Sequence, residues 1–329
     1  MNQARNPRDQ GKNGSPVPPR RGGGRSRGGP ARPGGPARPG GPPRTDGTAR
    51  GPAVRAARRR RNLWALSAVV GVVVVVAALV GFGLSSGGGG GSGTPRSPIP
   101  ADVSDHLSHV PVSTLVGASS RVGVLNPAQA LQGPALTSKG KPELLYIGAE
   151  FCPVCATERW PMLVALSQFG RFSHLSQTHS AVKEGDIATV TFYGSTYSSP
   201  YLTFTPVETT TNQPSGSYYK TLETPTSDQS ALWYRLEGNP QSPTFPFIDI
   251  AGKYMLLTSQ YPEQVVAGHS FATIAGSIGS NDNTIGADVD ASAAGLVKYI
   301  CAATGQQPAA TCQAVAGVNA PVSHGSTSG

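Results

Sequence analysis

Residues 141–155 read Lys-Pro-Glu-Leu-Leu-Tyr-Ile-Gly-Ala-Glu-Phe-Cys-Pro-Val-Cys, and this stretch decides the fold. Its apolar centre, bounded by a proline and a glycine, is typical of a turn followed by a buried strand. The next segment, 156–169, carries apolar residues at helical spacing. The order strand, Cys-x-x-Cys, helix predicts an α/β domain with both cysteines at the start of a helix.

The two cysteines of this motif, Cys152 and Cys155, are candidates for thiol–disulfide exchange. The thiolate is the attacking species, and the unpaired N–H groups of a helix N-terminus stabilise it. Cys152 would then attack, and Cys155, one turn deeper, would resolve the mixed disulfide. A structural disulfide between them is one alternative. A zinc half-site is another, but His106 and His109 do not have a convincing ligand spacing.

A second element lies at residues 244–253, where Pro246 opens a short apolar strand that ends in a hairpin turn. A proline at this place can be an ordinary trans residue of an edge strand or a cis residue, and the sequence does not decide the isomer.

Together these elements resemble the thioredoxin superfamily. The resemblance implies that Pro246 is cis, packs against the active-site disulfide and helps to hold an extended substrate. A closer resemblance is to domain-of-unknown-function family 929, a thioredoxin-like family of actinobacteria and archaea. It covers nearly all of residues 100–312 and implies an α/β, thioredoxin-like fold with an insert. The stretches that carry it are 147–156, 158–160, 165–170, 246–250 and the terminal pair Cys301 and Cys312.

Some positions depart from the thioredoxin pattern. Many thioredoxins carry a buried Asp six positions before the first cysteine, where this chain has Tyr146. Glu150 or Glu158 could substitute as proton acceptor. The dipeptide inside the motif is Pro-Val, without the His of strongly oxidising relatives, and Phe245 is bulkier than usual before the proline. These departures distinguish the motif from the common thioredoxin pattern and from that of the strongly oxidising relatives.

A long polar and aromatic insert, residues 194–244, follows the first half of the domain. We expect it to form helices and loops over the active-site face, where it would either shape the choice of substrate or serve as structural padding.

The remaining cysteines, Cys301 and Cys312, follow a helix-like stretch that begins near Asp288. An even number of cysteines in an exported domain is compatible with two disulfides. A structural Cys301–Cys312 disulfide is the favoured interpretation, and a relay that passes electrons to the Cys-x-x-Cys pair is the alternative.

Charge is divided unevenly along the chain. Residues 1–62 hold sixteen of the 27 Lys and Arg residues but only two acidic ones, and they show no apolar periodicity. This composition predicts a disordered basic tail. The rest of the chain carries an acidic excess, so a nucleic-acid function for the folded domain has no electrostatic support.

Residues 63–84 form an apolar run without a charged residue, directly after Arg58–Arg61. As a helix the run is about 33 Å long, which is enough to span a bilayer. The arginines place the N-terminus in the cytoplasm and the C-terminal domain outside. A cleaved signal peptide is the competing interpretation.

The expected organisation continues with a Gly/Ser/Pro linker over 85–99, the folded domain over 100–315 and a flexible tail over 316–329. The function expected from these features is a membrane-anchored, extracytoplasmic thiol–disulfide oxidoreductase that acts through Cys152, Cys155 and Pro246. Its partners would be the thiols and disulfides of exported proteins, with a membrane redox protein as a further candidate. No cofactor or metal is expected. The alternative is a non-catalytic thioredoxin-like module that binds a cell-envelope partner and uses its cysteines as structural disulfides.

Overall fold

The computed structural model describes residues 94–120, 123, 125–238 and 243–324. The predicted basic tail and membrane helix, and most of the predicted linker, lie outside these residues. Within the described part of the chain, none of the helices combines the length and the apolar character that crossing a bilayer requires.

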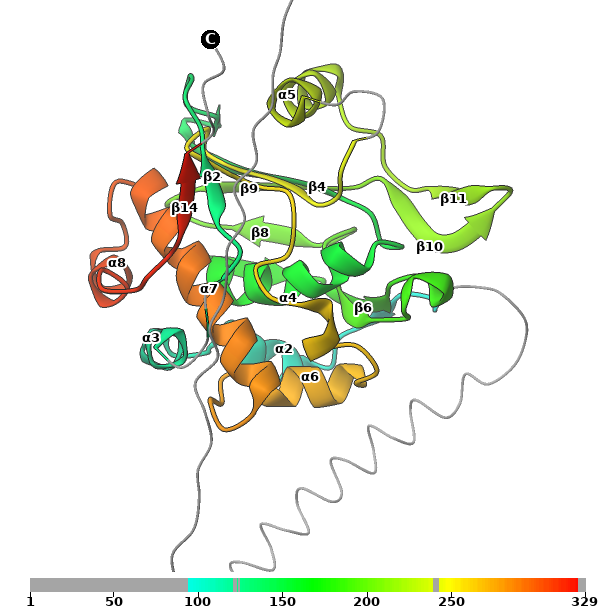
Figure 1. Ribbon diagram of the computed structural model, residues 1–329, viewed down its shortest axis with the longest axis horizontal. Coiled ribbons are helices and arrows are strands. Elements are labelled where there is room, and N and C mark those ends of the chain that lie inside the picture. Colours follow the sequence, from blue (N-terminus) through cyan, green and yellow to red (C-terminus); the bar gives the residue numbers. More distant parts are fainter. Residues whose placement is uncertain (1–93, 121–122, 124, 239–242, 325–329) are drawn as a thin grey trace, which may run out of the picture. The chain divides into compact units, whose positions relative to one another are not determined.

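A mixed sheet forms the centre of the domain, with the strand order β14-β2-β13-β12-β4-β3 and with β9 also paired to β4 (Figure 1). The pairing of β9 with β4 is parallel, and that of β12 with β4 is antiparallel. The strands are β2 (Ala128–Ala130), β3 (Thr137–Ser138), β4 (Lys141–Gly148), β9 (Thr203–Glu208), β12 (Phe247–Ile250), β13 (Tyr254–Leu256) and β14 (Val322–His324).

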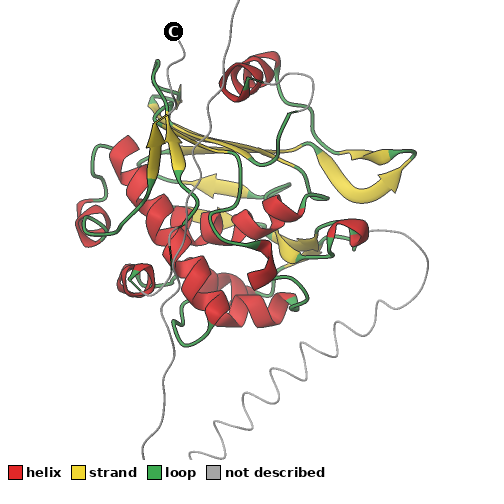
Figure 2. Ribbon diagram, viewed as in Figure 1, coloured by secondary structure: helices red, strands yellow, loops and turns green. Residues whose placement is uncertain are grey.

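The strand β4 is buried on both faces from Leu144 onward, as its apolar run predicts. Successive side chains of a strand point to opposite faces. Leu144 and Tyr146 accordingly join the large core beneath α4 (Pro153–Ser167) and α7 (Thr284–Ala303). Leu145 and Ile147 join a smaller core beneath α5 (Ser227–Glu237). Helices therefore cover both faces of the sheet (Figure 2).

The hairpin between β12 and β13 turns at Ala251 and Gly252, as the sequence predicts. Gly252 has a φ of +69°, and a Cβ at this position would lie 2.5 Å from the carbonyl oxygen of Pro134. Both the left-handed backbone and the close approach favour glycine.

Smaller elements surround this core, and the strands among them form the sheets β1-β6-β7, β5-β8 and β10-β11. They are β1 (Ser97–Pro98), α2 (Ala101–Ser108), α3 (Val112–Ser119), β5 (Arg171–Ser173), β6 (Ser176–His179), η1 (Val182–Glu184), β7 (Ala188–Thr191), β8 (Thr196–Ser198), β10 (Thr210–Ser215), β11 (Tyr218–Thr221), η2 (Glu263–Val265), α6 (Phe271–Ser277) and α8 (Ala309–Ala314).

The insert over 194–244 differs from the expected helices and loops. Its described residues form β8, β9, the β10–β11 hairpin and a single helix, α5. Because β9 pairs with β4 along six residues, this insert completes the central sheet rather than only covering it. Threonines and a proline give β9 a polar sequence, which an edge strand tolerates because one side of it needs no ladder partner.

The expected boundaries of the domain also need correction. The segment expected to be a flexible tail contains β14, which pairs in parallel with β2. The segment expected to be a linker contains β1, which pairs with β6. Both corrections have one cause: short strands at a sheet edge gain stability from a neighbouring strand, and a local sequence pattern does not reveal that neighbour.

Candidate functional site

The loop from β4 to α4 places Cys152 at the N-cap of α4. The residue has extended backbone angles (φ −76°, ψ 123°), and its Sγ accepts a hydrogen bond from the Cys155 N–H at 3.2 Å. Pro153 occupies the first helical turn, where a missing N–H costs nothing. The predicted position of the cysteines at a helix start is therefore confirmed.

The two sulfurs lie in different environments. Cys152 is 5% exposed and Cys155 is fully buried, and neither forms a disulfide. Hydrogen bonds from the side chain and the backbone N–H of Cys155 lower the pKa of Cys152, against the opposing effect of burial. Burial, and then the neighbouring Cys152, raise the pKa of Cys155 well above its usual value. Cys152 is therefore the stronger candidate for the thiolate.

Pro246 lies beside this pair because β12, which it precedes, pairs with β4. The Phe245–Pro246 peptide bond is cis, the isomer that the resemblance implies. The carbonyl oxygen of Phe245 lies 3.8 Å from the Sγ of Cys152, which donates to it in the thiol form. The described residues thus bring together the three predicted site residues.

A buried ion pair lies behind the cysteines. Arg159 of α4 donates from Nε and Nη2 to the two carboxylate oxygens of Glu208 at 2.9 and 2.7 Å. Both side chains are fully buried. Nη2 also donates to the carbonyl oxygen of Ala149 at 2.8 Å, and Ala149 packs against both cysteines.

No motif in the sequence indicates a role for Arg159 or Glu208. The available signal was a pair of charged residues, Glu158 and Arg159, on a helix that is otherwise mostly apolar, but the partner of Arg159 is 49 residues away. The sequence therefore could not identify the pair.

Glu150 and Glu158, the two carboxylates considered as proton acceptors, have other partners. Both oxygens of Glu150 accept from Arg96 at 3.0–3.1 Å, and Thr191 Oγ1 donates to one of them at 2.8 Å. Glu158 accepts a hydrogen bond from the Gln260 N–H at 2.9 Å, and burial raises its pKa to about 8. The contacts of Glu158 direct it to the 259–261 loop, away from the sulfurs.

Aromatic side chains of the insert border the site. Phe151 stacks on Tyr219 with ring centroids 4.4 Å apart, and its ring edge meets Tyr218, which is 52% exposed. A pocket of about 510 Å³ lies beside them, and none of its lining residues is charged. The lining residues are Thr209, Thr210, Tyr218, Thr224, Pro225, Ser230, Trp233, Tyr234, Pro243 and Phe245.

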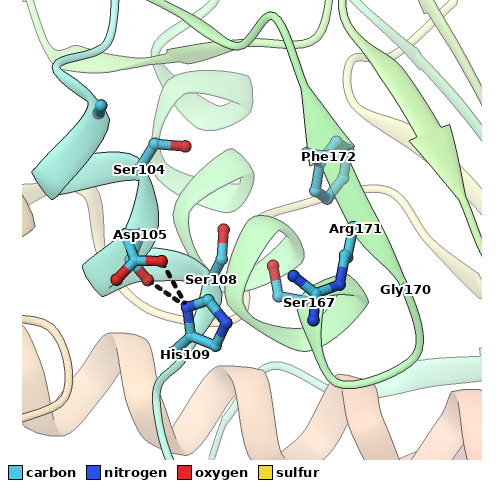
Figure 3. Close-up of a pocket in the computed structure, with 9 residues that line it drawn as sticks. Ser104, Asp105, Ser108, His109, Ser167, Gly170, Arg171 and Phe172 are labelled. Atoms are coloured by element: carbon cyan, nitrogen blue, oxygen red, sulfur yellow. Dashed lines mark hydrogen bonds and ion pairs between the residues drawn. The ribbon is translucent and has the colours of Figure 1, made fainter.

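Another pocket, of about 340 Å³, lies at the opposite end of α4, next to Ser167 (Figure 3). In it, Nδ1 of His109 lies 3.1 Å from a carboxylate oxygen of Asp105, one helical turn away. Both side chains are more than half exposed, so the pair contributes little to stability. The 15-residue helix places this pocket about 22 Å from the cysteines. It is a surface feature separate from the candidate site.

Cys301 and Cys312 form the expected disulfide, which joins the last turn of α7 to α8. Both residues are buried in the large core and not in the cluster that holds Cys152 and Cys155. In Figure 1, α8 and the β10–β11 hairpin beside the candidate site lie at opposite edges of the domain. This separation favours the structural role over the relay.

Comparison with known proteins gives one match. A family model described as a domain of unknown function (DUF929) matches residues 129–302, which include Cys152, Cys155, Arg159, Glu208 and Pro246. No curated protein and no solved structure matches the chain.

Proposed function

The chain belongs to the DUF929 family, and we propose that it is a thiol–disulfide oxidoreductase that acts through Cys152 and Cys155. The observation that carries the proposal is the asymmetry of the two sulfurs. One sits at a helix N-terminus with a lowered pKa, and the other is buried with a raised pKa. Nucleophilic and resolving cysteines require this division.

The topology supports a thioredoxin-like core. Four strands take the order β13-β12-β4-β9, in which β9 runs parallel and β12 antiparallel to β4. The cysteine motif lies between β4 and α4, the cis proline precedes β12, and α7 packs on the same face as α4. This is the arrangement that the sequence resemblance implies.

The exchange reaction proceeds in two steps. The Cys152 thiolate attacks one sulfur of a client disulfide, and the client S–S bond breaks as the new bond forms; the departing sulfur takes up a proton. Cys155 then loses its proton and attacks Cys152, so that the client leaves as a second thiol. The client gains two electrons and the Cys152–Cys155 pair loses them. In the reverse direction the protein oxidises its client, and a second redox protein restores the starting state.

The client binds beside Phe245. The pocket of about 510 Å³ offers aromatic and hydroxyl groups without a charge, which suits a neutral, partly apolar side chain next to the reacting cysteine. The exposed Tyr218 at its edge provides an amphipathic contact.

The location we propose is the outer face of the cell membrane. Arg58–Arg61 followed by the apolar run 63–84 supports a single membrane anchor with its N-terminus in the cytoplasm. The Cys301–Cys312 disulfide supports an oxidising compartment. Clients would then be exported proteins.

Trapping of mixed disulfides tests the proposal. In the full chain, Cys155→Ser removes the resolving thiol, so client proteins should stay bound to Cys152 through a disulfide. These adducts are measured as reducible bands in a cell-envelope extract after acid quenching. Cys152→Ser is the matched control and should trap none. Equal, background-level trapping by both variants would contradict the proposal and favour the binding module.

A further inference from the structure

Arg159 has a hydrogen-bonding capacity that the fold does not use. Its guanidinium is fully buried, and its Nε and Nη2 are occupied by Glu208 and Ala149. Nη1 is also buried but has no hydrogen-bond partner among the described residues. A buried, charged donor without a partner is costly, so its retention needs an explanation.

The geometry directs this cation to the sulfurs. Arg159 follows Cys155 by four residues and therefore lies on the same face of α4. The carbonyl oxygen of Ala149 accepts both from Nη2 of Arg159, at 2.8 Å, and from the N–H of Cys152, at 3.2 Å. One carbonyl group therefore joins the guanidinium to the cysteine loop.

Tyr146 provides a second buried group without a partner. Its hydroxyl has no hydrogen-bond partner among the described residues, and its ring lies 5.9 Å from the Arg159 guanidinium. The hydroxyl lies directly over Gly148, where a Cβ would be 2.1 Å away. Glycine thus opens the space through which the tyrosine reaches the end of β4 that precedes the cysteines. Burial raises the pKa of Tyr146 well above its usual value, so the hydroxyl stays neutral.

We infer that Arg159 is a positioning residue for the exchange reaction, whose fixed positive charge stabilises the thiolate form of the resolving Cys155. The inference rests on the proposed function. Glu208 holds the guanidinium in place through two hydrogen bonds and cannot itself stabilise an anion.

The charged and titratable groups around Cys155 support this assignment. They come from each element packed against it and are Cys152 and Arg159 of α4, Tyr146 of β4, Glu208 of β9 and Tyr218 of β11. Among these described groups Arg159 is the cation. Burial, Cys152 and Glu208 raise the pKa of Cys155, whereas Arg159 lowers it and also lowers the pKa of Cys152.

The step that benefits is the resolution of the mixed disulfide. Cys155 loses its proton, its sulfur bonds to Sγ of Cys152, and the bond from Cys152 to the client breaks. The electron pair leaves with the client sulfur, which takes up a proton, so one proton passes in net from Cys155 to the client. Arg159 stays protonated throughout and stabilises the anion that forms in between.

A chromogenic mixed disulfide tests the inference. Reaction of the reduced full chain with 5,5′-dithiobis(2-nitrobenzoate) breaks the reagent's disulfide, releases one thionitrobenzoate and leaves the other on Cys152. Attack by Cys155 then releases this second thionitrobenzoate, which is measured as a separate phase of absorbance. The release rate is followed against pH. In the charge-neutral pair Arg159→Met/Glu208→Gln, release near neutral pH should slow by about tenfold and its midpoint should move up by about one pH unit.

The single variant Glu208→Gln makes the opposite prediction. It retains the cation, keeps an oxygen acceptor for it and removes the negative charge, so the midpoint of release should move down. If the ion pair has only a structural role, the substitutions should lower the melting temperature but should not move the release midpoints of the two variants in opposite directions. This variant also tests the inference if the double variant does not fold.

Glu158→Gln is the matched control. The residue is a neighbour on the same helix and equally buried, but it contacts the 259–261 loop, so the release profile should not change. Unchanged midpoints in folded Glu208→Gln and in the double variant would overturn the inference. If Cys152 instead reacts with the reagent no faster than a peptide thiol, the proposed function itself fails.

Discussion

At the scale of single residues, Glu158 and Arg159 show that burial alone does not fix a charge state. They are adjacent on α4 and both are fully buried. Arg159 has a carboxylate partner and keeps its charge. Glu158 receives one backbone hydrogen bond, and burial raises its pKa to about 8, so it is mostly protonated at neutral pH. The partner, and not the depth, decides the charge.

Replacing Glu158 by Gln tests this difference. The folded pKa of about 8 lies above the usual value of 4.5, so the folded state binds an extra proton between these pH values. The stability that this proton provides is complete at low pH and is lost as pH rises from about 4.5 to 8, with a slope of up to about 1.4 kcal/mol per pH unit.

The variant lacks this slope. The free energy of unfolding of the full chain is measured with urea in detergent at pH 5 and pH 8, for the wild type and for Glu158→Gln. The stability of the variant relative to the wild type should increase as pH rises. A difference that stays constant with pH would contradict the assigned protonation state.

At the scale of elements, hydrophobic pattern predicted the buried parts and missed the polar edge. The strand β4 and the helix α4 were predicted because their apolar residues follow the two periods of local structure. The strand β9 was missed because its sequence, Thr-Phe-Thr-Pro-Val-Glu, is mostly polar and small. It becomes a strand through six pairings with β4. Tertiary context therefore overrode the local preference.

The disulfide that links α7 to α8 is expected to stabilise the fold. It closes a loop with a sequence separation of 11 residues, so replacing Cys301 and Cys312 together by Ser should lower the free energy of unfolding by about 3 kcal/mol. Chemical denaturation measures this loss. Alkylation of Cys152 in the folded variant should keep its rate. Normal stability combined with lost turnover by an oxidant would instead support the relay.

At the scale of the whole molecule, the segments at both ends of the described chain take part in the fold. The carbonyl oxygen of Thr94 accepts from Asn212 at 2.8 Å, and Arg96 forms an ion pair with the buried Glu150. At the other end, β14 extends the main sheet. The chain therefore enters the domain beside the loop that carries Cys152. A truncation that removes Arg96 would leave the buried carboxylate of Glu150 without its cation.

Reporter fusions test the proposed topology. The arginine run before residue 63 predicts that a reporter fused after Gly329 is active outside the cytoplasm and that one fused before Arg58 is active inside. Alkaline phosphatase, which needs an oxidising compartment, and a fluorescent protein that matures in the cytoplasm give the two readouts. The reverse pattern would contradict both the location and the class of client.

The sequence by itself determined the strand–Cys-Pro-Val-Cys–helix unit, the proline before the β12–β13 hairpin, the disulfide and the family. The first three depend on residue types at short spacing, which local periodicity and motif chemistry reveal, and the family follows from a resemblance that covers most of the folded domain. Only the tertiary structure decided that β9 pairs with β4, that Arg96 neutralises Glu150 and that Glu208 holds Arg159 behind the sulfurs. These partners are 49 or more residues apart in sequence. They meet because burial of the two faces of one sheet brings their elements together, and no local pattern records that packing.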